Sequence, residues 1–307
     1  MQLKPPFFWK NINIVSILLY PFTFITFLVN FFKIFSKKKK FNIKIICVGN
    51  IYVGGTGKTP LSIEINNILK KKFNTVFIKK KYDYQLDEQN LLKKNGKLIS
   101  KNDRSLGLKE AVRKKYELAI LDDGLQDKRI KYDISIACFN STSKIGNGFL
   151  LPAGPLREKL FSLKNYDAIF LNGKKKDKNF INKIKKINFK IKIFEANYKI
   201  TNLKKFNTKN KYLVFSGIGN PLEFEETLKK SKIKIFKHII FPDHYKLSFT
   251  DIKKIKQKAK KENLRIITTE KDYMRLNKTD KININFVKVK LKIKNLKNFY
   301  KFLIKKL

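Results

Sequence analysis

Short apolar runs alternate with stretches of helical spacing along most of the chain. Residues 59–70 carry apolar side chains three and four positions apart, among them Ile65 and Leu69, and this spacing predicts a helix. Apolar runs of strand length predict β-strands at residues 43–48, 75–78, 117–121, 133–139 and 166–171. Strands that alternate with helices are typical of a parallel sheet covered by helices. The pattern therefore predicts an α/β fold, with an α/β/α sheet domain in residues 41–171.

The alternation of strands and helices returns in the last third of the chain. Apolar runs predict further strands at residues 212–216, 234–240, 265–268 and 285–289. They define a second, smaller α/β domain, which we place in residues 212–307. Residues 172–211 are rich in Lys and Asn and contain only short β-like pieces. We interpret them as a linker region.

The N-terminal segment has a different pattern. No charged residue occurs from Ile12 to Phe32, and Lys33 and a run of lysines at residues 37–40 follow. As one helix, the uncharged segment would be about 30 Å long, close to the thickness of the hydrocarbon core of a bilayer. We therefore predict an N-terminal hydrophobic membrane helix and a membrane-anchoring segment in residues 1–40. The lysines place the rest of the chain on the cytoplasmic side.

A cleaved signal, a core helix and an interfacial helix are the alternatives to a membrane-spanning helix for this N-terminal segment. A cleaved secretory signal is disfavoured, because no cleavage site of small residues follows and because the segment ends in lysines. A helix buried in the protein core is disfavoured by the length. Pro21 and the polar residues Ser16, Thr23, Thr26 and Asn30 are compatible with a kinked helix that lies in the membrane interface. The sequence leaves open whether the segment crosses the membrane or lies on it.

Composition excludes several classes of protein. With 307 residues and 43% apolar residues, the chain is long enough and apolar enough to build a core. Its 2 cysteines, Cys47 and Cys138, lie in apolar runs and indicate buried thiols rather than a disulfide framework. The net charge is +46, but only six of the 70 basic residues are Arg and the Lys residues are scattered. We expect no nucleic acid partner, because nucleic-acid readers rely on Arg. The oligomeric state stays unknown.

A glycine-rich loop between the first predicted strand and the first predicted helix is the sharpest motif. Glycines let backbone amides approach phosphate oxygens, and a helix N-terminus attracts anions. Lys58 would reach the terminal phosphates as a point charge. The usual pattern has Gly where this chain has Tyr52, so the motif is a variant. We expect ATP to be bound by Tyr52, Val53, Gly54, Gly55, Thr56, Gly57, Lys58 and Thr59.

A pair of carboxylates follows another predicted strand. Asp122 and Asp123 end the apolar run at residues 117–121, and ligands of parallel α/β sheets bind at the carboxyl ends of the strands. Hard cations such as Mg²⁺ prefer oxygen ligands. A simple turn explains these aspartates equally well, but not their match to the phosphate loop. We therefore expect Thr59, Asp122 and Asp123 to hold Mg²⁺, directly or through water.

Several segments together resemble one family, the tetraacyldisaccharide 4'-kinases of lipid A synthesis. They occur in the family's order through most of the chain. A phosphate loop alone is common, whereas the whole series is specific. The matching segments are VGN at residues 48–50, VGGTGKTP at 53–60, DDGLQ at 122–126, GNG at 146–148, LLPAGPLRE at 150–158, GIGNP at 217–221, FPDHY at 241–245 and TTEKD at 268–272.

The resemblance implies a reaction, a substrate and a location. It implies that the γ-phosphate of ATP is transferred to the 4'-hydroxyl of tetraacyldisaccharide 1-phosphate, a lipid A disaccharide precursor, to give lipid IVA. It also implies work at the cytoplasmic face of the bacterial inner membrane, where this lipid lies. The expected partners are therefore the lipid substrate and inner membrane lipid.

The resemblance also implies two catalytic residues. In the family, an Asp in a Gly-Asp-Glu-Pro segment acts with a His of the second domain. Here Asp87, in the segment LDEQ at residues 86–89, corresponds to this Asp and is the expected base. His244 in FPDHY corresponds to the His, whereas His238 lies inside an apolar run and is expected to be structural.

Departures from the family's motifs keep other functions open. The family's Ser-Arg-Gly-Tyr segment is replaced by KKKY at residues 79–82, and Asp127 stands where the family has His. One alternative is a different membrane-associated P-loop NTPase. The sequence NKTD at residues 277–280 matches the motif of a guanine-binding loop, but it follows a helical stretch rather than a strand. The other alternative is a basic module that binds membrane or nucleic acid without catalysis.

Overall fold

The structure is a computed structural model that describes residues 6–82, 86–173, 177–243 and 245–307. Contacts divide the chain into two compact units. The larger unit consists of Pro5–Asp83, Leu92–Asn197 and Ile293–Leu307. The smaller unit is built mainly from Tyr198–Lys292 and includes Tyr84–Leu91. Each unit is described below by itself.

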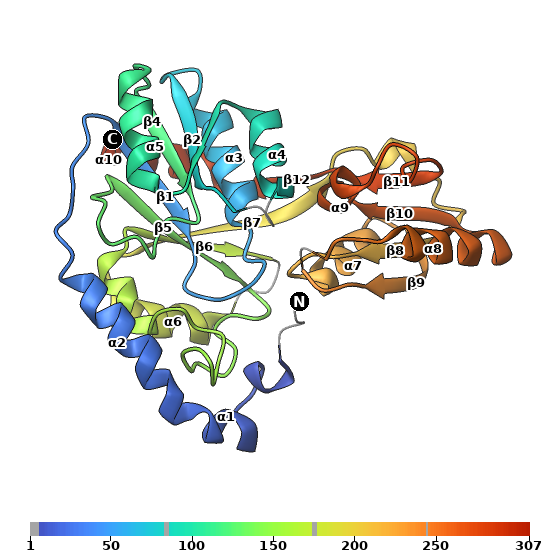
Figure 1. The fold of residues 1–307 in the computed structure, drawn as a ribbon, viewed down its shortest axis with the longest axis horizontal. Coiled ribbons are helices and arrows are strands. Elements are labelled where there is room, and N and C mark those ends of the chain that lie inside the picture. Colours follow the sequence, from blue (N-terminus) through green and yellow to red (C-terminus); the bar gives the residue numbers. More distant parts are fainter. Residues whose placement is uncertain (1–5, 83–85, 174–176, 244) are drawn as a thin grey trace. The chain divides into compact units, whose positions relative to one another are not determined.

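An eight-stranded sheet forms the centre of the larger unit (Figure 1). The strand order is β12-β7-β6-β5-β1-β4-β2-β3, and every pairing from β7 to β3 is parallel. The order places β1 between β4 and β5, so the loop after β1 and the end of β4 share one edge of the sheet. The strands are β1 (Lys44–Gly49), β2 (Thr75–Lys80), β3 (Leu98–Lys101), β4 (Leu118–Asp122), β5 (Ile134–Asn140), β6 (Ala168–Asn172), β7 (Lys192–Ile200) and β12 (Val289–Ile293).

Helices cover both faces of this sheet. Leu108 of α5 and Ile184 of α6 belong to one buried cluster with alternate strand residues such as Leu171. Phe170, the next residue of β6, points to the opposite face and stacks edge-on against Phe299 of α10. α3 contacts β1, β2 and β4. The helices of the larger unit are α3 (Lys58–Leu69), α5 (Arg104–Arg113), α6 (Lys178–Ile187) and α10 (Leu296–Lys306), and a 3-10 helix covers Leu160–Asn165. Residues of α4 (Leu86–Asn95) are divided between the two units after Leu91.

The smaller unit has a four-stranded sheet of its own. The order is β11-β10-β8-β9, and all three pairings are parallel. Leu228 of α7 packs with Val214 on one face, and Ile255 of α8 packs with Leu213 on the other. The elements are β8 (Lys211–Ser216), α7 (Pro221–Lys230), β9 (Lys234–Ile240), α8 (Phe249–Lys261), β10 (Arg265–Thr269), α9 (Glu270–Arg275) and β11 (Ile284–Val287), with a 3-10 helix at Leu203–Lys205.

The structure confirms the α/β fold, whereas the predicted segment boundaries need correction. Residues 172–211 are not a linker region, because they contain α6 and β7, and β7 belongs to the larger sheet. The Lys and Asn residues lie between buried apolar positions such as Phe180 and Ile184, which the composition concealed. The second domain also does not extend to residue 307. β12 and α10 return to the larger sheet.

The N-terminal apolar segment is not one long helix. It forms α1 (Ile14–Leu18), a 3-10 helix (Tyr20–Phe22) and α2 (Thr23–Ile34), and another 3-10 helix (Phe7–Trp9) precedes them. Pro21 lies at the break, where its missing amide hydrogen is tolerated. Within the described part of the chain, no helix is long and apolar enough to cross a membrane. The structure therefore does not support one continuous N-terminal membrane helix.

Polar side chains of this segment face the rest of the larger unit. Ser16 and Thr23 are buried. Thr26 Oγ1 donates to the carbonyl of Leu151 at 2.8 Å, and Asn30 Nδ2 donates to the carbonyl of Arg157 at 2.7 Å. The large apolar side chains are exposed instead, namely Ile14, Ile17, Leu18, Phe24, Ile25, Phe32, Ile34 and Phe35. The segment is thus amphipathic with its polar side against the protein.

Candidate active site

The predicted phosphate loop connects β1 to the N-terminus of α3. Gly54 has a φ of 125° and Gly57, the N-cap of α3, has a φ of 85°. Residues with a Cβ atom rarely adopt such positive φ angles. Asn50 Nδ2 holds the loop from inside, through bonds to the Gly54 carbonyl at 3.3 Å and to Thr56 Oγ1 at 3.0 Å. The side-chain amide of Asn172 at the end of β6 donates to the Thr56 carbonyl. The loop therefore has a fixed turn that ends at a helix N-terminus, an arrangement that favours phosphate.

Tyr52 and Val53 contact the chain itself in this structure. Tyr52 forms an isolated β-bridge with Leu156, and the amide of Val53 donates to the carbonyl of Pro155 at 2.8 Å. Both partners belong to the LLPAGPLRE segment. The start of the loop is therefore tied to this segment, and the expected contact of Tyr52 and Val53 with ATP stays a prediction.

Asp122 ends β4 and accepts hydrogen bonds from three side chains. Thr59 Oγ1 donates to Asp122 Oδ2 at 3.0 Å, and Ser62 Oγ donates to Oδ1 at 3.1 Å. The third donor is the ammonium group of Lys79, which lies 2.7 Å from Oδ2. Asp122 is fully buried. Its carboxylate therefore fixes the hydroxyl group of Thr59 at the start of α3.

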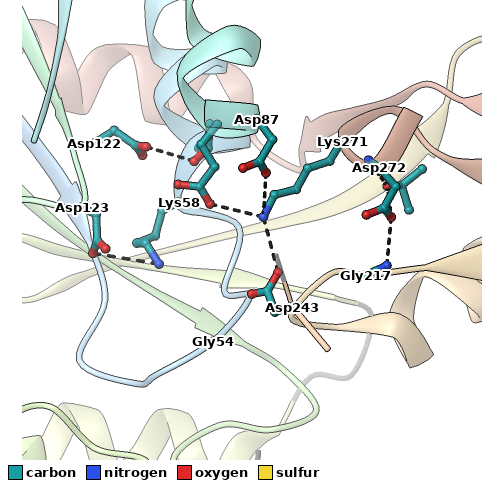
Figure 2. A network of polar contacts seen from close by, with 12 residues as sticks. Gly54, Lys58, Asp87, Asp122, Asp123, Gly217, Asp243, Lys271 and Asp272 are labelled. Carbon is teal, nitrogen blue, oxygen red and sulfur yellow. Dashed lines mark hydrogen bonds and ion pairs between the residues drawn. The ribbon is translucent and has the colours of Figure 1, made fainter. Parts of the chain in front are cut away.

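Asp123 lies beside the phosphate-loop lysine (Figure 2). Its Oδ1 is 3.9 Å from Lys58 Nζ and 3.0 Å from a guanidinium nitrogen of Arg157. Its φ of 59° turns the side chain out of the direction of β4. Burial by itself would raise the pKa of the Asp123 carboxyl, but Lys58, Arg157, Lys79 and Arg104 together lower it to about 2. Asp123 is consequently a carboxylate at any physiological pH.

The residues around Thr59 fit a magnesium ion. Thr59 uses its hydroxyl hydrogen on Asp122, so the oxygen lone pairs remain for a cation. Mg²⁺ in kinase sites takes one or two carboxylates together with water and substrate phosphates rather than a protein cage. Residues 6–82, 86–173, 177–243 and 245–307 contain no group of three or more His, Cys, Asp or Glu residues placed to hold a metal.

Asp87 lies in a charged cluster of the smaller unit (Figure 2). It is in the first turn of α4 and is 4% exposed. Its Oδ2 is 2.9 Å from a guanidinium nitrogen of Arg275 and 3.3 Å from Lys271 Nζ, and both cations come from α9. Lys271 also lies 3.4 Å from both Glu88 Oε1 and Asp243 Oδ1. Burial would lower the pKa of Lys271, but Glu88, Asp243 and Asp87 raise it.

Asp272 anchors Arg275. It accepts from the Gly217 amide at 3.0 Å and from Thr269 Oγ1 at 2.7 Å, and its Oδ1 is 2.9 Å from Arg275. Burial raises the pKa of Asp272, although Arg275 opposes this effect. Segments GIGNP and TTEKD thus meet at Asp272. Together they orient the guanidinium group that contacts Asp87.

The two histidines have different outcomes. His244 lies outside the described residues, so its expected catalytic role stays a prediction. His238 is on β9, where Ser216 Oγ lies 2.8 Å from Nε2 and Glu225 Oε2 lies 3.0 Å from Nδ1. This side chain is 4% exposed. A buried, hydrogen-bonded ring agrees with the structural role expected for His238.

The sequence and the fold of this chain are similar to those of known proteins. The model of the family described as Tetraacyldisaccharide-1-P 4'-kinase matches residues 15–307. The tetraacyldisaccharide 4'-kinase of Pelagibacter ubique (strain HTCC1062) is 50% identical over 311 residues, which cover 99% of this chain and 98% of that protein. The chain belongs to the tetraacyldisaccharide 4'-kinase family.

Other relatives agree with this membership. The tetraacyldisaccharide 4'-kinase of Rickettsia bellii (strain OSU 85-389) is 33% identical, and the match covers 100% of this chain and 99% of that protein. The crystal structure of LpxK from Aquifex aeolicus in complex with ATP has a TM-score of 0.70 and 23% identity, and it covers 95% of this chain and 99% of its own. This last likeness is one of fold.

Sequence reasoning did not assign a role to several charged residues of the site. Arg157, Lys271 and Asp272 lie inside the family's segments, which was the available signal. Arg275 is one helical turn beyond Asp272 and contacts it, as i, i+3 pairs do. Lys79 lies in the segment KKKY that replaces the family's Ser-Arg-Gly-Tyr, but its pairing with Asp122 could not be predicted from the sequence.

Asp127, at the family's His position, is paired within the larger unit. Its two carboxylate oxygens accept from Nε and a terminal nitrogen of Arg129, each at 2.9 Å.

Proposed function

We propose that this chain is an ATP-dependent lipid kinase that phosphorylates the 4'-hydroxyl of tetraacyldisaccharide 1-phosphate. The carrying observation is a glycine-rich phosphate loop, with Lys58 and Thr59 beside Asp123 and Asp122, in a chain that is 50% identical over almost its whole length to a tetraacyldisaccharide 4'-kinase. The product would be lipid IVA. The rival NTPase and binding-module functions leave the family membership unexplained.

Phosphate transfer requires positioning and charge neutralisation more than covalent chemistry. In this proposal, the backbone amides at the N-terminus of α3 and the Lys58 ammonium bind the terminal phosphates. Mg²⁺, held by Thr59, Asp122 and Asp123, neutralises negative charge on the phosphates when it is bound. Arg157 keeps Asp123 in place, because it contacts both oxygens of that carboxylate at 3.0 and 3.3 Å.

Asp87 is the proposed general base for the sugar hydroxyl. A base must have a fixed position within hydrogen-bond reach of the proton that it takes. Arg275 and Lys271 fix Asp87 from one side, since both contact Oδ2. His244 is proposed to act with Asp87, in the role that the family resemblance gives it.

The N-terminal segment is proposed to dock on the cytoplasmic face of the inner membrane without crossing it. Its exposed apolar side chains, such as Ile14 (76%) and Phe32 (67%), occur on both α1 and α2, as in helices that lie in a membrane interface. The lysines at residues 37–40 follow directly and line a surface hollow with Lys109 of α5. Basic side chains there suit anionic lipid headgroups.

Genetic replacement tests this function in a living membrane. A Gram-negative host whose own tetraacyldisaccharide 4'-kinase is depleted would receive either this chain or its Lys58→Ala variant. We expect growth and lipid IVA synthesis with the unchanged chain only. Accumulation of tetraacyldisaccharide 1-phosphate despite well-expressed protein would contradict the proposal.

A further inference from the structure

Lys79 places a buried positive charge at the proposed metal site. It lies near the end of β2, which pairs with β4 so that Ile78 is opposite Leu121. The next residues along the two strands, Lys79 and Asp122, are therefore neighbours, with Nζ and Oδ2 separated by 2.7 Å. Lys79 is 2% exposed and Asp122 is 0% exposed. An ammonium group is rarely buried to this extent unless it is paired with a carboxylate.

The charge of Lys79 acts on both aspartates at the end of β4. It shares Asp122 Oδ2 with the Thr59 hydroxyl, the group that would face a metal ion. It is also one of the cations that lower the pKa of Asp123. Two carboxylates that would otherwise present their full negative charge to Mg²⁺ are thus partly neutralised from inside the protein.

We propose that Lys79 is a built-in cation of the phosphate site, which positions Asp122 and takes over part of the charge neutralisation that the divalent metal supplies. This inference rests on the nucleotide site of the proposed function. Its consequence is a nucleotide affinity that depends only weakly on Mg²⁺. The positive charge reduces the repulsion between the two aspartates and the nucleotide phosphates, and it also opposes binding of Mg²⁺ in the absence of nucleotide.

A purely structural Lys79 makes a different prediction. If the ammonium only satisfied the buried Asp122, its removal would disturb the loop and weaken nucleotide binding equally with and without metal. If the Lys79 charge neutralises phosphate, its removal changes the ratio of the nucleotide affinity in Mg²⁺ to the nucleotide affinity without metal. This ratio is therefore the quantity to measure.

Binding of an ATP analogue with a non-transferable γ-phosphate would be measured by calorimetry, once in excess EDTA and once in excess Mg²⁺. Lys79→Met is the test variant. Lys80→Met is the matched control, because it removes the same charge from the next residue of β2, whose Nζ lies over the Tyr82 ring at 5.4 Å. We expect Lys79→Met to weaken binding in EDTA on the order of 10- to 100-fold and binding in Mg²⁺ by less than about 3-fold.

Two further variants complete a charge series at the same place. Asp122→Asn removes the negative charge beside Lys79. Lys79→Met with Asp122→Asn removes both charges and avoids an unpaired buried carboxylate if the single variant does not fold. In excess EDTA, we expect Asp122→Asn to bind the ATP analogue most tightly and Lys79→Met to bind it most weakly. Wild type and the double variant should have equal, intermediate affinities. Mg²⁺ alone should raise the melting temperature of Lys79→Met and leave that of wild type and the double variant unchanged.

The outcomes separate this inference from the function on which it rests. Equal losses in EDTA and Mg²⁺, or a Lys79→Met protein that behaves like Lys80→Met, would overturn the role of Lys79. Lys58→Ala serves as the control for the site itself and should lose nucleotide under both conditions. If Lys58→Ala bound nucleotide like wild type, the phosphate loop of the proposed function would be refuted, whatever Lys79 does.

Discussion

Replacing two exposed apolar residues of α2 should release the protein from membranes. Ile25 and Phe32 are 63% and 67% exposed, so the double variant Ile25→Ser, Phe32→Ser changes surface rather than core. Full burial of such a side chain contributes about 1.5–3 kcal/mol. Scaled by the exposed fractions, the two residues together contribute about 2–4 kcal/mol to docking, which corresponds to a partition coefficient roughly 30- to 1000-fold higher than in the variant.

Sedimentation with vesicles measures this partition directly. Vesicles of phosphatidylethanolamine and phosphatidylglycerol would be used at high salt, which screens the contribution of the lysines. Phe189→Ser with Phe249→Ser is the matched control, since these side chains are 76% and 71% exposed on other elements. Docking through α1 and α2 requires the control to bind like wild type. Equal binding by the α2 variant and the control would refute docking through this helix.

Further variants test the polar parts of the site. Lys58→Ala should reduce kcat/KM at least about 1000-fold and abolish ATP binding in calorimetry, because the phosphates lose their point charge. Arg275→Met should reduce kcat about 10- to 100-fold with unchanged ATP affinity, because it removes a cation that fixes Asp87, the proposed base; a change confined to ATP affinity would contradict this. The stabilisation that Asp123 contributes is complete above its ordinary pKa of 3.8 and is lost as the pH falls toward about 2. Arg157→Met raises this pKa and should move acid unfolding, followed by fluorimetry, to higher pH than the surface control Arg129→Met.

Strands and the phosphate loop could be predicted because each is encoded locally. Apolar runs gave most strands of both sheets, but not β3, β7 or β12. The Gly-Lys-Thr ending after β1 gave the start of α3. The return of β12 and α10 to the larger sheet could not be predicted. Phe299 contacts Phe170 and Phe194, which are distant in the sequence, only because the tertiary fold brings them together. The linker error has a similar origin, since Lys and Asn on the exposed side of α6 diluted its apolar pattern.

Charged partners were less predictable than the residues that they contact. Asp87, Asp122 and Asp123 lie in recognisable segments, whereas their cations Arg275, Lys79 and Arg157 come from other elements. In a chain with 70 basic residues, nothing local separates a buried Lys79 from a solvated lysine. The break in the N-terminal helix was signalled by Pro21, but its inward polar face depends on carbonyls of residues 151 and 157, which only the fold supplies.

Direct transfer of phosphate to the lipid tests the central claim. The purified protein would be incubated with Mg-ATP and tetraacyldisaccharide 1-phosphate in detergent micelles, and the lipid would be analysed by mass spectrometry. The proposed function predicts a lipid that carries one additional phosphate at the 4' position, and no such product with Lys58→Ala. ATP hydrolysis that leaves the lipid unphosphorylated would contradict it.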